Sequence, residues 1–74
     1  MADFEEVKQL MKTMGFAGYE FHENTDLYKD LGVDSTEIVD ICVKAEKHFG
    51  VKLIPDSFCT LGEMVSEINK LRPN

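Results

Sequence analysis

The sequence is poor in cysteine and in positive charge, and each shortage excludes a class of protein. Its two cysteines, Cys42 and Cys59, show no metal-binding spacing and lie in apolar periodic segments. We therefore expect buried free thiols and no disulfide framework. Eight basic residues stand against fourteen acidic ones, for a net charge of −6 at pH 7. This balance argues against nucleic acid as a partner and favours partners with basic docking surfaces.

Long apolar runs are also missing. The apolar residues are too interrupted for a membrane span, and no secretory signal pattern opens the chain, so we expect a cytoplasmic protein with no membrane partner. Seventy-four residues predict one domain, 1–74, near the lower size at which a core is stable without metal or disulfides. The opening Met1 and the expected fraying before Asn74 favour a free-standing chain, which we expect to be a monomer.

The most informative stretch reads DLGVDSTEI and predicts the start of a helix. Asp34 has the position of the N-cap, and Glu37, three residues later, completes a capping box. Val33 before the cap and Ile38 after it form the matching hydrophobic staple. Ser35 is then the first helical residue. Its hydroxyl should be exposed beside the positive end of the helix dipole, where an attached phosphate is favoured.

Apolar residues at helical intervals predict an earlier amphipathic helix over roughly residues 4–14. Asp3 and Glu6 form a capping box at its start, and Gly15 is suited to a left-handed C-cap. We expect a long first loop between the two helices, pinned by its own side chains. The expected anchors are Phe16, Tyr19, Phe21, Leu27, Tyr28 and Leu31. Within the loop, Thr25 is a candidate cap for a single helical turn.

The same loop contains a partial match to an EF-hand calcium site. The acidic residues at positions one, five, nine and twelve of that pattern are Asp26, Asp30, Asp34 and Glu37. Position three is Tyr28, which is no normal oxygen ligand, and position six is Leu31 where the pattern needs glycine. The acids are better explained as caps and solvated charges, and a calcium sensor is kept only as an alternative.

The helix that begins at Ser35 is predicted to run to His48 or Phe49, with Gly50 as its stop. One face of it is expected to be buried: Ile38, Ile41, Cys42, Ala45 and Phe49. Val39 and Val43 lie on the flank that also carries Ser35. They either form part of a docking surface for a partner or widen the core stripe, and the sequence leaves both interpretations open.

The remainder predicts one short and one longer helix. Pro55 imposes an extended approach, and so few residues follow it that the short helix is expected to be a single turn, with Phe58 as its anchor. Thr60 and Glu63 form a third capping box, although Gly62 in the first turn weakens the helix. The apolar stripe of this last helix is Leu61, Met64, Val65, Ile68 and Leu71. We expect an all-α fold, a small antiparallel bundle of three longer helices and one short helix.

The run LGVDS, followed by an apolar helix that ends in FGV, resembles the attachment site of acyl carrier proteins. The resemblance extends to the length, helix spacing and acidity of the whole chain. It implies that Ser35 is converted to a 4′-phosphopantetheine ester by a phosphopantetheinyl transferase that uses coenzyme A, with Asp34 as part of the motif. The family motif has leucine after the serine, and that leucine touches partner enzymes. Here the position is Thr36, which bears on the identity of the partners.

The resemblance implies a carrier whose thiol holds acyl or polyketide groups as thioesters and shuttles them between loading, condensing or tailoring enzymes. The expected docking residues are Thr36, Glu37, Val39, Asp40, Val43 and Glu46. Lys44, Lys47 and His48 interrupt the acidic run that is usual in carriers of general fatty-acid synthesis. Together with Thr36, they favour a specialised polyketide or modified fatty-acid pathway.

The chain is not expected to be an enzyme, because it pairs no cysteine or serine with a histidine and an orienting carboxylate. Besides the calcium sensor, two alternatives to the acyl carrier remain. Aminoacyl or peptidyl carriers usually have a second glycine before the serine, where this chain has Val33 and Asp34. A non-covalent helical adaptor would dock through Val39 and Val43 and leave Ser35 unmodified.

Overall fold

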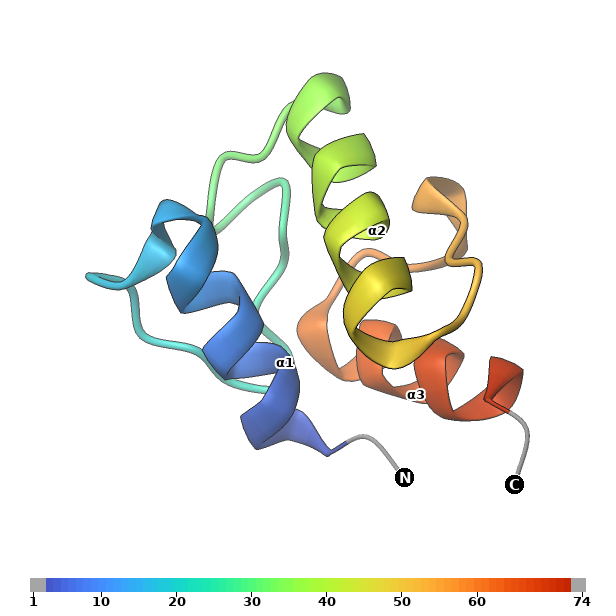
Figure 1. Ribbon diagram of the computed structural model, residues 1–74. Helices are drawn as coiled ribbons and strands as arrows, with labels where there is room; N and C mark the ends of the chain where they lie inside the picture. Colours follow the sequence, from blue (N-terminus) through green and yellow to red (C-terminus); the bar gives the residue numbers. More distant parts are fainter. Residues whose placement is uncertain (1–2, 73–74) are drawn as a thin grey trace.

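Three helices carry the regular structure of residues 3–72, the part of the chain that the computed structural model describes (Figure 1). The elements in order are α1 (Phe4–Met11), a π-helical turn η1 (Lys12–Phe16), α2 (Ser35–Phe49), a 3-10 turn η2 (Pro55–Ser57) and α3 (Leu61–Leu71). In Figure 1, α1 and α2 run in opposite directions, and α3 runs below α2 and beside the lower end of α1. These elements confirm the all-α prediction. The expected ends at Met1 and Asn74 lie outside the described residues.

Capping boxes begin all three helices, as the sequence predicts. The N-cap side chains of Asp3, Asp34 and Thr60 accept from the amide three residues later at 2.9, 2.8 and 3.1 Å. In each case a glutamate at that third position bonds back to the amide of the cap. The amides of Cys59 and Thr60 both donate to the Glu63 carboxylate and lower its pKa, because they favour its charged form.

The first helical segment differs slightly from the expected span of 4–14. Its α-helical part ends at Met11, and the wider turn η1 carries the chain on to Phe16, whose side chain is buried. Gly15 has φ of +98°, the left-handed conformation predicted for it, because a residue without Cβ adopts it without strain. This turn directs the chain away from the helix axis and into the first loop (residues 17–34).

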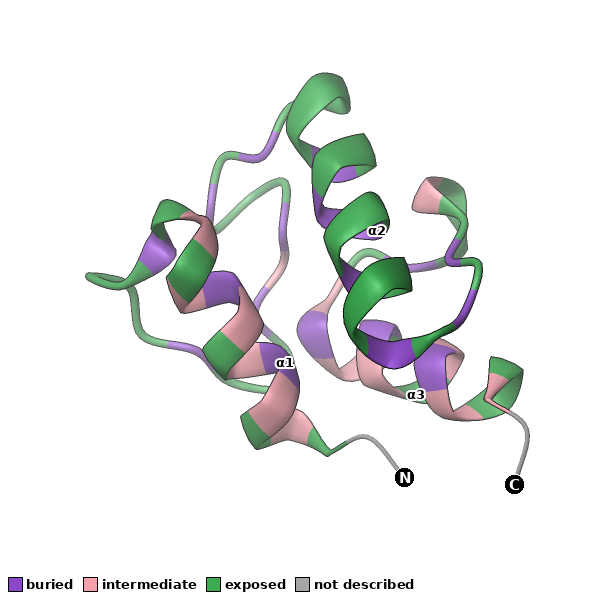
Figure 2. Ribbon diagram, in the orientation of Figure 1, coloured by how far each residue is buried: buried purple, intermediate pink, exposed green. Residues whose placement is uncertain are grey.

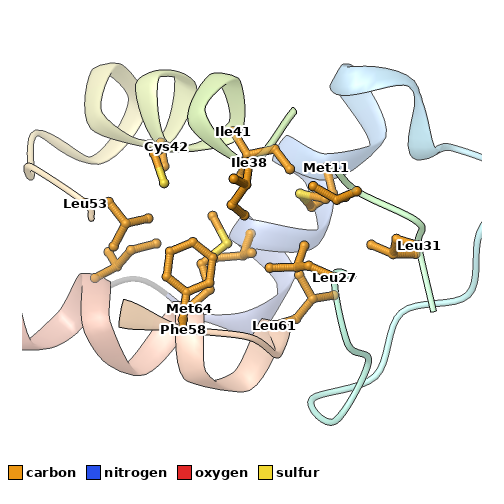
Figure 3. Packing of buried hydrophobic residues seen from close by; sticks show 14 of the residues in the cluster. Met11, Leu27, Leu31, Ile38, Ile41, Cys42, Leu53, Phe58, Leu61 and Met64 are labelled. Carbon is orange, nitrogen blue, oxygen red and sulfur yellow. The ribbon is translucent and has the colours of Figure 1, made fainter. Parts of the chain in front are cut away.

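One cluster of buried apolar side chains connects the helices and the loops (Figure 3). All five residues predicted for the core face of α2 are buried, and Phe58 after η2 is buried as expected. Figure 2 shows how burial is confined to the inner side of α2 while its outer side is exposed. The expected burial was wrong for the loop anchors Tyr19 and Tyr28 and for Leu71 of the last apolar stripe. They are exposed, although Tyr19 makes an edge contact with the Phe16 ring.

The first loop is held to the start of α3 by backbone hydrogen bonds. Gly62 donates to the carbonyl of Glu23 at 2.7 Å, Leu61 donates to that of Thr25 at 3.0 Å, and Leu27 donates to that of Cys59 at 2.9 Å. We call this contact the loop–α3 junction (residues 23–27 with 59–62). It includes an isolated antiparallel bridge between one residue of each segment. A long connection without helix is thereby ordered by non-local pairing.

The expected helical cap at Thr25 was wrong. The buried Thr25 hydroxyl accepts from the amide of His22 at 2.8 Å. The following turn is capped by Asp26, whose carboxylate accepts from the amides of Tyr28 and Lys29 at 2.9 and 2.8 Å. The sequence pattern missed this because an Asp and a Thr at adjacent positions are both suited to capping. The cap is decided by which of them faces the turn.

We predict that Gly62→Ala destabilises the protein, although alanine is the better helix former by about 1 kcal/mol. A Cβ at this position would lie 2.8 Å from the carbonyl oxygen of Glu23. We expect the free energy of unfolding, measured in urea, to fall by about 1–3 kcal/mol because backbone must move. Ser66→Ala on the exposed face of α3 is the control, with an expected change within about 0.5 kcal/mol. An unchanged or increased free energy of unfolding in Gly62→Ala would contradict the prediction.

We also predict that Asp34→Ala lowers the free energy of unfolding by about 1 kcal/mol, because the Glu37 amide loses its acceptor. Asp40→Ala, which removes an exposed carboxylate of the same helix outside the cap, should change it by less than about 0.5 kcal/mol. Urea titrations of both variants followed by circular dichroism make the comparison. Equal losses at the two positions would show that the cap contributes nothing beyond charge.

Candidate functional site

Ser35 is exposed and begins α2, as the sequence predicts. The chain reaches it through Gly32, at φ of +68°, and through Val33, which is buried. Val33 also donates its amide to the carbonyl of Leu27 at 3.0 Å. Asp34 then has the extended conformation of an N-cap. The serine hydroxyl is therefore presented on a rigid helix end whose approach is anchored on both sides of the turn.

The first turn of α2 leaves two amides available beside this hydroxyl. The Glu37 amide bonds to the Asp34 carboxylate, and the Ile38 amide bonds to the Asp34 carbonyl at 2.9 Å. The amides of Ser35 and Thr36 have no partner among the hydrogen bonds of residues 3–72. Such orphan amides, together with the helix dipole, favour a negatively charged group. The donor set therefore fits a phosphate ester on Ser35.

The start of α3 provides a contrast. All four of its first amides have partners: Leu61 and Gly62 donate to the first loop, and the next two donate to Thr60. The two helices begin with the same kind of capping box. They differ because the first loop covers the end of α3 and leaves the end of α2 open. Among the helix starts within residues 3–72, only that of α2 thus combines free amides with an exposed serine.

An exposed apolar row continues from Ser35 along α2. Val39 and Val43 follow it at i+4 and i+8, and their side chains are 51% and 41% exposed. The valines therefore do not belong to the buried core, which removes the interpretation that they widen the core stripe. Ile54, just before η2, is 59% exposed, and η2 packs against α2. The exposure of Ile54 could not be predicted from the sequence, since an isoleucine before proline gives no sign of which way its side chain faces.

The remaining expected docking residues lie on the same exposed side of α2. Thr36, Glu37, Asp40 and Glu46 are all exposed, and so are the cations Lys44 and Lys47. Glu37 also serves the capping box, so its charge is partly committed to the helix start. None of the ion pairs among residues 3–72 involves a residue of α2. The charges of this helix are therefore available to a partner.

The acids of the partial calcium pattern have other roles. Asp26 caps its own turn, and the Asp30 carboxylate accepts from the Asp26 amide at 2.7 Å. Asp34 and Glu37 are joined in the capping box of α2. Within residues 3–72, no group of three or more His, Cys, Asp or Glu side chains is arranged to hold a metal ion. The geometry gives the calcium alternative no ligand set in this part of the chain.

The two cysteines have opposite environments. Cys42 is buried in the core, and this burial raises the pKa of its thiol to about 11, which keeps it protonated and unreactive. Cys59 is also free but exposed, so the expectation that both thiols are buried was wrong for Cys59. It lies directly before the Thr60 cap, where its backbone is used in the loop–α3 junction and its side chain points out of the core.

A shallow groove of about 400 Å³ lies at the opposite end of α2. It is formed mainly by α1 and by His48. The half-buried Leu10 lines it together with the acidic residues Asp3, Glu5 and Glu6. At 1.5 Å per residue, His48 is about 20 Å from Ser35 along the helix. The groove and the exposed serine are therefore separate features. Every helix within residues 3–72 is too short or too polar to cross a membrane.

Comparison with known proteins agrees with this geometry. Residues 5–68 match the family model described as a phosphopantetheine attachment site, a span that includes Ser35. A protein of Thermotoga maritima named acyl carrier protein is 34% identical over 71 residues, which cover 90% of this chain and 88% of that protein. Phosphopantetheine, covalently attached, is the prosthetic group of this family. The chain belongs to the acyl carrier protein family.

Proposed function

We propose that residues 1–74 act as a single carrier domain and that Ser35 bears the 4′-phosphopantetheine. The observation that carries this proposal is the exposed serine at the first position of a capped helix, with two free amides beside its hydroxyl. A phosphate ester formed there gains from the helix dipole without displacing an existing hydrogen bond. The bound group supplies a flexible arm with a terminal thiol, which holds acyl or polyketide groups as thioesters.

The residues around Ser35 have distinct tasks in this proposal. Asp34 holds the helix end in place through its bond to the Glu37 amide. Gly32 supplies the turn, since its positive φ disfavours other residues. Val33 is buried beneath that turn and prevents the serine from moving with the loop. The protein thus presents the hydroxyl and a docking surface for partner enzymes, and it performs no chemistry itself.

The docking surface is the exposed side of α2 that carries Thr36, Glu37, Val39, Asp40, Val43 and Glu46. Exposed valines bordered by acids suit enzymes with basic, partly apolar docking surfaces, in which charge steers the encounter and apolar contact holds it. The phosphopantetheinyl transferase and the acyl-loading, condensing or tailoring enzymes are the partners proposed for it. Thr36 and the cations Lys44 and Lys47 favour a specialised polyketide or modified fatty-acid pathway over general fatty-acid synthesis.

One observation keeps a non-covalent adaptor as a second candidate. The exposure of Val39 and Val43 supports docking whether or not Ser35 is modified. An adaptor would bind partners with Ser35 bare, whereas a carrier needs the serine for every function. An aminoacyl carrier shares the attachment chemistry, so the cargo has to be identified after modification is established.

We predict that incubation with coenzyme A, magnesium and a broad-specificity phosphopantetheinyl transferase adds one phosphopantetheine, read as a single increase in intact mass. Ser35→Ala should remain unmodified. Ser57→Ala removes an exposed serine from η2 and is the matched control, which should be modified like the parent. A folded parent that gains no mass would overturn the proposal and leave the adaptor. Modification of Ser35→Ala would place the attachment elsewhere.

We further predict that Val43→Ser lowers kcat/KM for modification by the transferase roughly tenfold, or about 1.4 kcal/mol of lost contact. Its effect on the free energy of unfolding should stay within about 0.5 kcal/mol, because the side chain is already half exposed. Leu71→Ser is the matched control: Leu71 is 44% exposed at the end of α3, away from the proposed surface. Equal kcat/KM values for the two variants would contradict the role of Val43 in docking.

A further inference from the structure

We infer that Gly62 in α3 is a positioning residue for Ser35, acting through the loop–α3 junction. The inference rests on the proposed role of Ser35 and concerns how its hydroxyl is placed for modification. Gly62 is remote from Ser35 in sequence and belongs to a different helix. A continuous run of backbone hydrogen bonds and buried side chains nevertheless connects the two.

The first link is the close approach of the loop to α3. Gly62 donates to the Glu23 carbonyl at 2.7 Å, and a Cβ on Gly62 would meet that oxygen at 2.8 Å and the Glu23 Cβ at 3.3 Å. At the other four glycines an added Cβ would meet nothing within 4 Å. Gly62 is thus the position where the absence of a side chain lets two backbones touch. This explains a glycine in the first turn of a helix, where it lowers helix propensity.

The second link is Leu27, whose backbone forms hydrogen bonds both with Cys59 and with Val33. Its amide donates to the Cys59 carbonyl at 2.9 Å, on the α3 side of the junction. Its carbonyl accepts from the Val33 amide at 3.0 Å, on the side of the functional serine. Its side chain is fully buried and lies near that of Leu61 in the core (Figure 3). A shift of residues 23–27 relative to α3 is therefore transmitted to Val33.

The third link is the short distance in sequence from Val33 to Ser35. Val33 is buried, so its side chain and its amide hold it at two independent points. Asp34 follows directly as the cap, and Ser35 begins the helix. If the hydrogen bond from the Val33 amide to the Leu27 carbonyl is lost, residues 32–34, which lead to the cap, become free to move while α2 itself stays folded. Transfer to the serine needs its hydroxyl held in one orientation, and small misplacements of a reacting group reduce rates strongly.

The experiment compares Gly62→Ala with Leu10→Ala at a temperature where both remain folded. Leu10 is half buried on α1, beside the groove at the far end of α2, so its truncation loosens the core away from the junction. Amide hydrogen exchange by NMR compares the amide of Val33 with that of Gly50, which bonds to Glu46 at the end of α2. The same samples are modified with coenzyme A and the transferase to obtain kcat/KM.

In Gly62→Ala we expect the exchange of Val33 to accelerate at least about tenfold relative to Gly50, and kcat/KM to fall about fivefold or more. In Leu10→Ala the exchange ratio and kcat/KM should stay within about twofold of the parent. A purely structural role for Gly62 would accelerate both amides together. An unchanged ratio in Gly62→Ala, or an unchanged kcat/KM, overturns the inference.

A second variant keeps the test decisive if Gly62→Ala does not fold. Replacing the Val33 amide by an ester, through chemical synthesis of the chain, removes the donor to Leu27 and changes no side chain. We expect a similar fall in kcat/KM with the fold retained, and a parental value overturns the inference. If the unaltered protein itself gains no phosphopantetheine, the proposed function fails. The exchange ratio in Gly62→Ala then still decides whether the junction holds Val33.

Discussion

Satisfaction of the backbone amides at the helix starts is the constraint on which this structure depends. Each helix begins with a capping box, which supplies partners for two of the four orphan amides. At α3 the first loop supplies the other two through Glu23 and Thr25. The long loop therefore has a structural role beyond connection. It completes α3, and α3 in return orders the loop.

The hydrogen-bond partners of the first amides also distinguish α2, which carries Ser35, from α3. The first loop pairs with the start of α3, whereas the amides of Ser35 and Thr36 at the start of α2 have no hydrogen-bond partner within residues 3–72. Val33, directly before the cap, is buried and donates its amide to the carbonyl of Leu27. A carrier needs such a combination: a hydroxyl accessible to a transferase, a local field that favours phosphate, and an anchored backbone. The outer face of α2 continues from this end as a surface of exposed valines and exposed charged side chains.

Much of the fold could be predicted from the sequence, because its signals are local. Capping boxes at Asp3, Asp34 and Thr60 located three helix starts, and Gly15 and Gly50 marked the predicted turns after α1 and α2. A helical period identified the buried face of α2. Local signals failed where neighbours compete for one role, as Thr25 and Asp26 do. They also failed for anchors such as Tyr28, whose burial depends on what packs against it.

Sequence by itself determined that Ser35 begins a capped helix and that an acyl-carrier motif surrounds it, since both depend on residues within a few positions of one another. Only the tertiary structure decided that Val39 and Val43 are exposed rather than core, because exposure depends on where the other helices pack. The tertiary structure also explains the glycine at position 62, which helix propensity alone would disfavour. The reason is physical: the contact of Gly62 with Glu23 joins segments remote in the chain, and no local pattern encodes the distance between them.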